Sequence, residues 1–454
     1  MSTKELNAII ILMFSKKLKI TLIFLGDIAI LYGSLTLTLL IRYGQANFYD
    51  SFGAHLKPFS VIFILWILIL YLSDLYSDKF LKNNLETARI FSISIAINIF
   101  LSVAAFYAFE PFFQLTPKTN LLIFSLIFGV GGYFWRIILS KFFIAKGIQK
   151  QVLIIGASPI ISFIIEHLKN NPQTGYNIKL WIKEPLSEKK FPELSANIID
   201  NKIETIITES HIKKDSSAAK IIYRLLPLGI QIIDLADFYE LLFQKVPLKE
   251  LEETWFIEQI TTSRKLYEIA KRFLDIVLSL ILNIIFLPLT IGIAFLIKFT
   301  SSGPIIYKQE RIGKNDKPFI LYKFRTMKIN HSGPLWTAEK DVRLTFVGKI
   351  LRYTHLDEIP QLYNILKGSI SLIGPRPERS ELAKHYSQLP YYEIRHIIKP
   401  GLTGWAQLNY KPSSSLEEAQ EKLQYDIYYV KNRSLFLDFL IILKTIKYIF
   451  ISHQ

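Results

Sequence analysis

The stretch KRFLDIVLSLILNIIFLPLTIGIAFLIK, from Lys271 to Lys298, decides how the second half of the chain meets a membrane. It exceeds the roughly 20 apolar residues that cross a bilayer, but basic residues stand at both of its ends. If it crossed, the basic segment that follows would be exported, although basic segments normally stay on the cytoplasmic side. Pro288, near the middle, removes a backbone donor and favours a bend.

We therefore predict a re-entrant helix over residues 271–298 that enters and leaves the bilayer by one face. A kinked span is the alternative, because proline is tolerated in spanning helices. The residues assigned to this membrane hairpin are Lys271, Arg272, Asp275 and Pro288.

The composition agrees with a membrane protein, because 50% of the 454 residues are hydrophobic and the mean hydropathy is +0.28. The net charge of +16 suits anionic lipids, phosphorylated ligands or nucleic acid. No nucleic-acid-binding module is recognisable, so we expect membrane lipids and no nucleic acid among the partners. The chain has no cysteine, which excludes disulfides, thiolate metal sites and cysteine nucleophiles.

Four long apolar runs precede this stretch, at residues 19–42, 58–72, 89–109 and 119–139. Each approaches the length of a membrane span; the second is short, and a buried helix of a soluble domain is its alternative. Basic residues before the first run, between the second and third, and after the fourth place both ends of this bundle in the cytoplasm. These residues are Lys16, Lys17, Lys19, Lys79, Lys82, Arg89, Arg136, Lys141, Lys146 and Lys150. The first run is too long for a cleavable signal and no small-residue cleavage site follows it.

Strand and helix patterns alternate from residue 150 onward, which predicts a small Rossmann-like α/β domain. Gly156 stands at a strand-to-helix turn where a dinucleotide fingerprint would begin. Ala157, Ser158 and Pro159 follow it, so the G-x-G-x-x-G spacing is absent. We therefore expect a packing or regulatory role rather than cofactor binding.

Two adjacent carboxylates, Asp357 and Glu358, open the segment LDEIPQLYNILKG. Neighbouring helical residues point in different directions, so one acid can attack while the other holds metal. Pro360 predicts that a helix begins close to Asp357. The free N–H groups at the start of this helix would keep Asp357 ionised and help to bind a phosphate. Phosphoryl chemistry at a carboxylate uses Mg²⁺, so we expect Mg²⁺ at Glu358 and Asp357. A solvated acidic pair at a helix start is the alternative.

Basic residues near the acids are candidates for binding phosphate. Arg376 is fixed between Pro375 and Pro377, and the guanidinium fork matches two phosphate oxygens. A basic face against anionic lipid is the alternative for the other candidates. These are Lys323, Arg325, Arg343, Arg352 and Arg311. Further on, Gly401, Gly404 and Trp405 predict a tight turn with an aromatic side chain at the membrane boundary.

Six motifs in this part of the chain resemble, in order, those of the bacterial sugar transferases, the monotopic polyprenyl-phosphate phosphoglycosyl transferases. They are KRFLD, SSGPIIYKQERIG, YKFRTM, LDEIPQLYNILKG, SLIGPRPE and PGLTGWAQ, and the resemblance begins at Leu266. The bundle and the α/β domain resemble the large members, and the C-terminal segment resembles the exopolysaccharide subgroup associated with exosortase systems. The chain departs from the family at Leu287-Pro288, where Ser-Pro is common, and at residues 368–371, Gly-Ser-Ile-Ser in place of Gly-Asp-Met-Ser.

The resemblance implies that Asp357 attacks the β-phosphate of a nucleoside diphosphate sugar, such as a UDP-sugar, and releases a nucleoside monophosphate. The phosphosugar held by Asp357 then passes to undecaprenyl phosphate, with Mg²⁺ on Glu358 and phosphate on Arg376. This would be the first membrane step of exopolysaccharide biosynthesis, catalysed by a multi-pass protein at the cytoplasmic face of the bacterial inner membrane.

Three further expectations concern the surroundings of this site. The last helical segment, with Asp438, Lys444 and Lys447, is expected to lie along the membrane surface. The loop 328–340, which holds His331, Gly333 and Trp336, would act as a flap over the donor. The bundle and the middle domain offer surface for a homodimer.

We therefore predict a membrane protein of the α and α/β class with three domains. They are a four-helix transmembrane bundle (1–145), a Rossmann-like α/β domain (146–255) and a monotopic catalytic domain with a re-entrant helix (256–454). One alternative is a membrane-anchored, NAD-dependent nucleotide-sugar dehydratase or epimerase that uses the middle domain. Another is a non-enzymatic scaffold for polysaccharide assembly.

Overall fold

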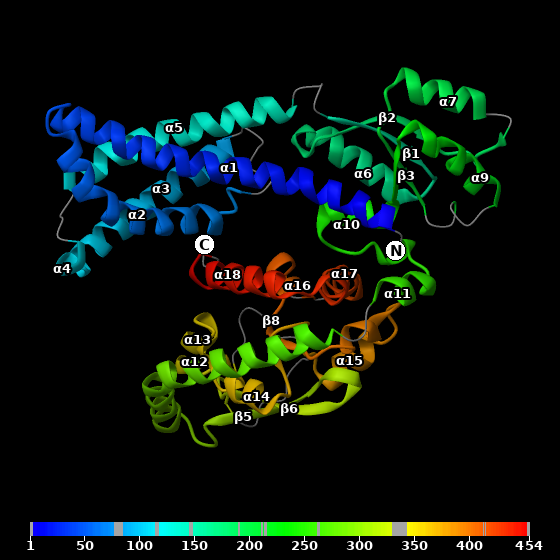
Figure 1. Ribbon diagram of the computed structural model, residues 1–454. Coiled ribbons are helices and arrows are strands. Elements are labelled where there is room, and N and C mark those ends of the chain that lie inside the picture. Colours follow the sequence, from blue (N-terminus) through cyan, green and yellow to red (C-terminus); the bar gives the residue numbers. More distant parts are fainter. Residues whose placement is uncertain are drawn as a thin grey trace. The chain divides into compact units, whose positions relative to one another are not determined.

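The protein is mostly helical and divides into two compact units, Met1–Phe238 and Tyr239–Gln454. Figure 1 shows the computed structural model. It describes residues 3–76, 85–113, 118–144, 149–188, 191–209, 212, 216–260, 264–328, 343–411, 413 and 415–451. Lys79, Lys82 and Lys146 of the orientation argument, and His331, Gly333 and Trp336 of the expected flap, lie outside the described residues.

Long apolar helices make up the first part of the first unit. They are α1 (Thr3–Tyr43), α2 (Phe48–Leu72), α3 (Leu85–Ala108) and α5 (Lys118–Ile144), with a short α4 (Glu110–Phe113). Each of the four contains a stretch long and apolar enough to cross a membrane. The second predicted span was short because its apolar run begins at Pro58, but α2 begins ten residues earlier and continues through that proline. These helices indicate a membrane protein.

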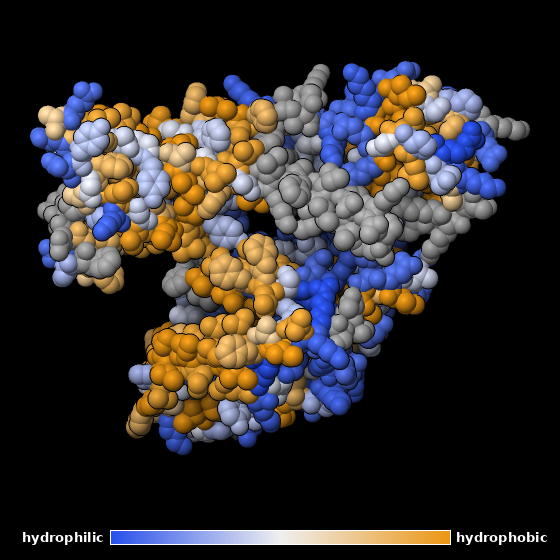
Figure 2. Space-filling view, viewed as in Figure 1, coloured by the Kyte–Doolittle hydropathy of each residue, from blue (hydrophilic) through white to orange (hydrophobic). Residues whose placement is uncertain are grey.

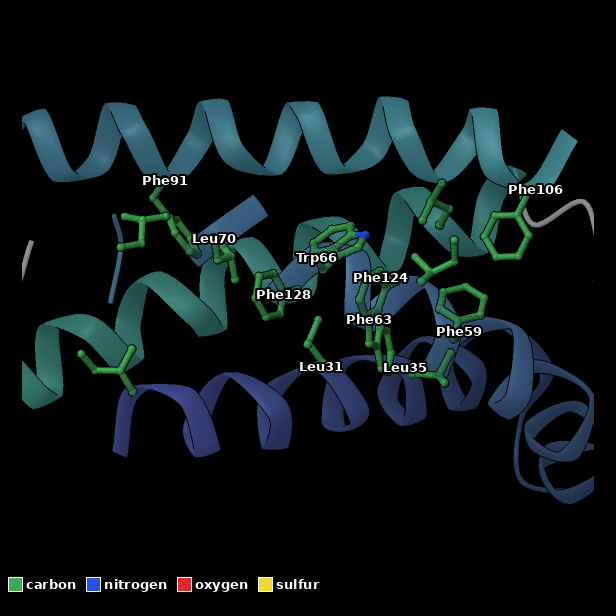
Figure 3. Close-up of a cluster of buried hydrophobic side chains, with 14 of the residues drawn as sticks. Leu31, Leu35, Phe59, Phe63, Trp66, Leu70, Phe91, Phe106, Phe124 and Phe128 are labelled. Atoms are coloured by element: carbon green, nitrogen blue, oxygen red, sulfur yellow. The ribbon is translucent and has the colours of Figure 1, made fainter. Parts of the chain in front are cut away.

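Aromatic side chains fill the centre of this bundle, as Figure 3 shows. The Trp66 ring lies 5.0 Å from the Phe124 ring and its indole N–H donates to the Ser102 hydroxyl at 2.9 Å. Arg136 was predicted to be an orienting charge beyond the fourth span, and this is wrong: it lies within α5. Its guanidinium binds both Asp27 oxygens, at 2.9 and 2.8 Å, and both side chains are buried.

A parallel four-stranded sheet in the order β2-β1-β3-β4 follows the bundle. Its strands are β1 (Lys150–Ile155), β2 (Tyr176–Ile182), β3 (Thr205–Thr208) and β4 (Gln231–Asp234). The helices of this part are α6 (Pro159–Asn170), η2 (Pro172–Thr174), α7 (Phe191–Asp200), α9 (Ser216–Leu225), η4 (Leu226–Leu228) and α10 (Leu235–Phe243). The central strands β1 and β3 carry apolar residues side by side, Val152–Ile155 in β1 and Ile206 and Ile207 in β3, because they are buried within the sheet.

The second unit contains the segment with the six motifs. Its helices begin with η5 (Leu248–Glu250), α11 (Glu253–Gln259), α12 (Lys265–Thr300), η6 (Lys314–Asp316), α13 (Phe346–Tyr353), η7 (Leu356–Glu358) and α14 (Gln361–Lys367). They continue with α15 (Ser380–Tyr386), η8 (Tyr392–His396), α16 (Trp405–Asn409), α17 (Leu416–Asn432) and α18 (Leu435–Ile451). Strands β5 (Ile306–Ile312) and β6 (Pro318–Phe324) form an antiparallel hairpin, and β7 (Ser371–Ile373) pairs in parallel with β8 (Gly401–Thr403).

Residues 239–255 belong to the second unit, although the sequence grouped them with the α/β domain. The Trp405 indole N–H donates to the Gln244 carbonyl at 3.0 Å, and Lys431 forms an ion pair with Glu240 at 2.8 Å. These contacts, made to residues far along the chain, leave no trace in local sequence patterns.

Helix α12 is the fifth helix of the described chain that is long and apolar enough to cross a membrane. It stays helical through Pro288, and Figure 1 shows the ribbon changing direction toward its C-terminal end. Near its start, the Asp275 carboxylate accepts from the Leu372 N–H at 3.0 Å, and near its end Ile293 and Ile297 pack in a buried cluster with Phe324. Both halves of α12 therefore contact the same unit. Between these contacts many apolar side chains are exposed, and Figure 2 shows them as a hydrophobic surface over α12.

Glycines bring β7 and β8 close together. A side chain on Gly401 would place its Cβ 2.0 Å from the Gly374 nitrogen, and one on Gly404 would lie 2.2 Å from the Gly374 carbonyl oxygen. In place of the predicted tight turn, Gly401 lies in β8 and Gly404 is extended before α16, and both glycines are required by close backbone contact. Trp405, expected at the membrane boundary, is instead only 3% exposed and lies within the protein.

The last helix, α18, was expected to lie along a membrane surface with Asp438 among its polar residues. Asp438 is instead buried, and its carboxylate accepts from Lys271 at 2.7 Å, Tyr267 at 2.9 Å and Tyr429 at 2.6 Å. This carboxylate joins α18 to α12 and α17.

Candidate active site

The acids Asp357 and Glu358 lie in a one-turn helix, η7, and not at the start of a longer helix as the sequence predicted. Helix α14 begins afterwards, at Gln361, with Pro360 as its N-terminal cap residue. His355 precedes the acids with φ of 56°, a left-handed conformation that is uncommon for residues other than glycine. The chain therefore turns sharply just before the acids, whereas after them Ile359 and Pro360 keep right-handed helical angles that lead into α14.

Glu358 is held by two cations at a single oxygen. Its Oε1 accepts from Lys323 Nζ at 2.5 Å and from Arg376 Nη2 at 3.2 Å. Burial would raise the pKa of Glu358, but Lys323 and Arg376 outweigh it and lower the pKa to about 2. Glu358 is therefore a fixed negative charge at neutral pH.

Asp357 shows the opposite shift. Burial raises the pKa of Asp357, and the neighbouring Glu358 charge adds to that rise, while Lys323 and Arg352 oppose it. A helix start was expected to favour the ionised form of Asp357, but the largest influence on its pKa is burial, which acts in the opposite direction. A carboxylate that is poorly solvated and less stabilised as an anion is a better nucleophile than a hydrated one.

Arg376 lies in the loop that follows β7, and its side chain remains 35% exposed. Arg311, expected to bind phosphate, donates instead from Nη1 to the Pro377 carbonyl at 2.9 Å and from Nη2 to the Gln309 side chain at 2.7 Å. Burial and the nearby Arg376 charge lower the pKa of Arg311 to about 10. Arg311 thus supports the loop that carries Arg376.

Of the other phosphate candidates, Arg352 acts on Asp357, whereas the contacts of Arg325 and Arg343 are made to other residues. Arg352 donates from Nε to the Thr326 hydroxyl at 3.0 Å, and its charge acts on Asp357. Arg325 donates from Nη2 to the Ser301 carbonyl at 2.8 Å, next to the end of α12. The Arg343 carbonyl accepts from the Lys328 N–H at 3.0 Å. Lys323 and Arg376 are the candidates that donate to the Glu358 carboxylate.

The residues assigned to the membrane hairpin hold α12 against the site. Arg272 donates to the carbonyls of Ile365 and Leu366, at the C-terminal end of α14, at 2.6 and 2.7 Å. Asp275 accepts from the Ser371 hydroxyl and the Leu372 N–H, both at 3.0 Å. Helix α12 therefore fixes both α14, which follows the acids, and β7, which leads to Arg376.

Buried charges behind the Arg376 loop were missed by the sequence analysis. They are Glu378, Arg395 and Asp426, which ion-pair with one another or with the partly exposed Lys422. Glu378 ends the motif SLIGPRPE, so a charged residue directly after Pro377 was the available signal. The other two come from η8 and α17, and nothing local in the sequence indicates that they are buried.

The site has part of what a magnesium ion requires. No group of three or more His, Asp or Glu side chains that could hold a metal is found in the described parts of the chain. Magnesium, however, is usually bound by one or two carboxylates together with waters and substrate phosphates. Adjacent carboxylates at Asp357 and Glu358 fit that requirement once a ligand supplies phosphate oxygens.

The glycine turn of the α/β domain has its own anionic group. The Glu209 carboxylate accepts from the Ser158 N–H at 2.9 Å, and a Cβ on Gly156 would lie 2.2 Å from this carboxylate. In dinucleotide-binding domains, this place at the helix start receives a pyrophosphate. A carboxylate there repels a phosphate, which disfavours the dehydratase alternative.

Comparison with known proteins agrees with this site. Residues 266–452 match the model of the family described as bacterial sugar transferase. A UDP-glucose:undecaprenyl-phosphate glucose-1-phosphate transferase of Caulobacter vibrioides is 39% identical over 184 residues, which are 39% of this chain and 69% of that protein. A protein of the same name from Klebsiella pneumoniae is 29% identical over 335 residues, covering 71% of this chain and 70% of the relative.

A third relative is the UDP-N-acetylgalactosamine-undecaprenyl-phosphate N-acetylgalactosaminephosphotransferase of Aeromonas hydrophila, 38% identical over 221 residues. That alignment covers 48% of this chain and 52% of the relative, about half of its length. Residues 266–452, which match the family model, contain α12 from its second residue onward, both acids and Arg376. On these matches, the chain belongs to the bacterial sugar transferase family.

Proposed function

We propose that this protein transfers a sugar 1-phosphate from a nucleoside diphosphate sugar, of the UDP-sugar class, to undecaprenyl phosphate. The observation that carries the proposal is the buried Asp357 beside Glu358, which Lys323 and Arg376 hold in place. The names of the relatives support the two substrate classes. They differ in the sugar, glucose or N-acetylgalactosamine, so the proposal extends to the reaction and not to the sugar.

The reaction proceeds in two displacements at phosphorus. First, an oxygen of Asp357 bonds to the β-phosphorus, and the bond from this phosphorus to the α–β bridging oxygen breaks. The nucleoside monophosphate leaves with that oxygen, and an aspartyl phosphosugar remains. Next, a phosphate oxygen of undecaprenyl phosphate attacks the same phosphorus, and Asp357 departs as a carboxylate. The product is a lipid-linked diphosphate sugar, the starting point for an exopolysaccharide.

The residues around Asp357 have distinct tasks in this scheme. Arg376 is exposed enough to bind the donor phosphates, and its planar fork suits two phosphate oxygens. Lys323 orients Glu358 and adds positive charge where negative charge develops. Mg²⁺ bound by Glu358, Asp357 and the donor phosphates would neutralise charge on the transferred group and the leaving group.

The membrane placement follows from the two substrates. A polyprenyl phosphate keeps its head group at the bilayer surface, while nucleotide sugars are water-soluble, so the site must lie at a membrane boundary. Helix α12 suits this requirement as a re-entrant element, because its two halves contact one compact unit while apolar side chains between them are exposed. We place this boundary at the cytoplasmic face of the bacterial inner membrane.

The experiment that tests the function offers a panel of UDP-sugars and undecaprenyl phosphate to the purified protein in detergent. UMP release is followed with Mg²⁺ and after its removal by EDTA. We expect repeated UMP release with one or a few sugars only when lipid phosphate and Mg²⁺ are present, at most one UMP per protein without lipid phosphate, and loss of turnover in Asp357→Asn. UMP release that is equal in wild type and Asp357→Asn would contradict the proposal.

A further inference from the structure

The loop that carries Arg376 is held by three cations, of which two are buried and the third, Lys422, is 13% exposed, and none of them takes part in the proposed reaction. Consecutive residues of the loop, Arg376, Pro377 and Glu378, each contact a different one. The three cations are Arg395 of η8, Arg311 of β5 and Lys422 of α17. We call them the loop cations.

Arg395 holds the backbone of Arg376 itself. Its Nη2 donates to the Arg376 carbonyl at 2.7 Å and also contacts Asp426 at 2.9 Å. Its Nη1 donates to the Tyr392 hydroxyl at 3.0 Å and lies 4.0 Å from Glu378. Arg395 and Asp426 are each only 3% exposed as side chains. One guanidinium therefore joins η8, α17 and the loop.

The other two loop cations fix the next residues. Arg311 donates to the Pro377 carbonyl at 2.9 Å, and Lys422 donates to the Glu378 carboxylate at 2.9 Å. Burial would raise the pKa of Glu378, but Lys422 and Arg395 outweigh it and lower the pKa to about 2, so these contacts persist at neutral pH.

Burial separates the loop cations from Arg376. The side chains of Arg395 and Lys422 are 3% and 13% exposed, and Arg311 is 8% exposed, whereas the Arg376 side chain is 35% exposed. The loop cations thus face the backbone and the protein interior, and Arg376 alone of the four reaches Glu358 and solvent. Such buried pairs cost desolvation energy and are weak evidence for stability, so a geometric role accounts for them better.

We propose that Arg395, Arg311 and Lys422 are positioning residues that preorganise Arg376 for the donor phosphate. This inference rests on the proposed function, in which Arg376 binds that phosphate. Because the loop backbone is fixed at three successive residues, it need not become ordered when the donor phosphate binds. The Arg376 guanidinium therefore keeps its orientation toward the phosphate in the transition state. Arg311 is thereby reassigned from a phosphate ligand to a support of the loop.

A double-mutant cycle between Arg395 and Arg376 tests the proposal. Arg395→Lys keeps the positive charge but loses the planar fork that contacts the Arg376 carbonyl and Asp426 together. We expect it to lower kcat/KM for the UDP-sugar about tenfold, with a raised KM, in an otherwise wild-type protein. In an Arg376→Gln background the same change should lower kcat/KM less than twofold, because the side chain that it positions is gone.

If Arg395 had a purely structural role, the effects of Arg395→Lys and Arg376→Gln on kcat/KM would multiply. Arg395→Lys would then lower kcat/KM by the same factor in both backgrounds, which would overturn the proposal. Glu240→Gln is the matched control, since it breaks a buried ion pair with Lys431 that does not touch the loop. It should leave KM for the donor unchanged. If Arg395→Lys is not folded, by its thermal unfolding midpoint, the same cycle is run with Lys422→Gln, and the same two results decide.

The outcome also separates this inference from the proposed function. If the wild type turns over a UDP-sugar and the cycle is multiplicative, only the positioning role fails. If the wild type turns over none of the panel, the proposed function fails and this inference fails with it.

Discussion

Asp357 and Glu358 are neighbours in the sequence, yet burial raises the pKa of the first while two cations lower the pKa of the second to about 2. The sequence predicted that the two acids act separately. It could not predict which is fixed by cations, because Lys323 comes from β6, 35 positions earlier, and Arg376 from a loop 18 positions later. Arg311, chosen as a phosphate ligand for its charge alone, supports the loop backbone instead.

Replacing the fixed charge tests its contribution. Glu358→Gln keeps the shape of the side chain but removes the anion that holds Lys323 and Arg376. We expect UMP release to fall by about 10²-fold or more, because the Lys323 and Arg376 charges are then misplaced around the transferred phosphate. Glu381→Gln, an exposed acid in α15, is the control and should retain wild-type turnover. Turnover within twofold of wild type in Glu358→Gln would contradict this role.

Glu378 predicts a pH dependence of stability. Its pKa in the folded protein, about 2, lies below the value of about 4.3 for an unfolded glutamate. Its ion pairs therefore stabilise the protein above about pH 4.3, and this stability is lost as the pH falls toward 2. The shift corresponds to roughly 3 kcal/mol. The difference in thermal midpoint between wild type and Glu378→Gln should be large at pH 7 and shrink below about pH 4.3. A difference in midpoint that stays constant with pH would argue against stabilisation by these ion pairs.

At the scale of single helices, the sequence predicted which segments are apolar but not where each helix begins or which side chains are buried. Apolar runs located the long apolar helices, but α2 begins ten residues before Pro58, where its run began, and α12 stays helical through Pro288, where a bend was expected. Asp438 was expected at a membrane surface because its helix mixes apolar and charged residues, and Trp405 because tryptophan favours the membrane boundary. Both are buried by contacts with residues far along the chain, which no local pattern contains.

The Asp27–Arg136 pair links α1 to α5 within the bundle. Removing one partner leaves a buried charge without compensation, which costs about 3–5 kcal/mol. Asp27→Asn should therefore lower the thermal midpoint clearly, as measured in detergent by intrinsic fluorescence. The control is Asp50→Asn, at an exposed position in the first turn of α2, which should unfold like the wild type. Equal midpoints for both variants would show that the pair does not hold the bundle.

At the scale of the whole molecule, the sequence supplied the order of the parts: apolar bundle, parallel sheet, then the unit with the acids. The second compact unit begins at Tyr239, and Glu240 and Gln244 contact α17 and α16 within it. The sidedness of α12 is the property of the whole chain that the proposed function requires.

Because the chain has no cysteine, single cysteines can report this sidedness. Lys265→Cys and Lys298→Cys place exposed thiols near the two ends of α12, and Gln45→Cys places one in the turn between α1 and α2. A re-entrant helix predicts that an impermeant thiol reagent added outside intact cells labels position 45 and neither end of α12. Labelling of position 298 alone among the α12 sites would show that α12 spans the membrane.

The central claim is that Asp357 carries the phosphosugar covalently. The most direct measurement of it is the intact mass of the protein after mixing with its UDP-sugar and Mg²⁺, without undecaprenyl phosphate, and rapid quenching in acid. The account predicts a rise by one sugar phosphate in the wild type, none in Asp357→Asn, and reversal when undecaprenyl phosphate is added before the quench. An unchanged wild-type mass with a UDP-sugar that the enzyme demonstrably turns over would contradict a covalent role for Asp357.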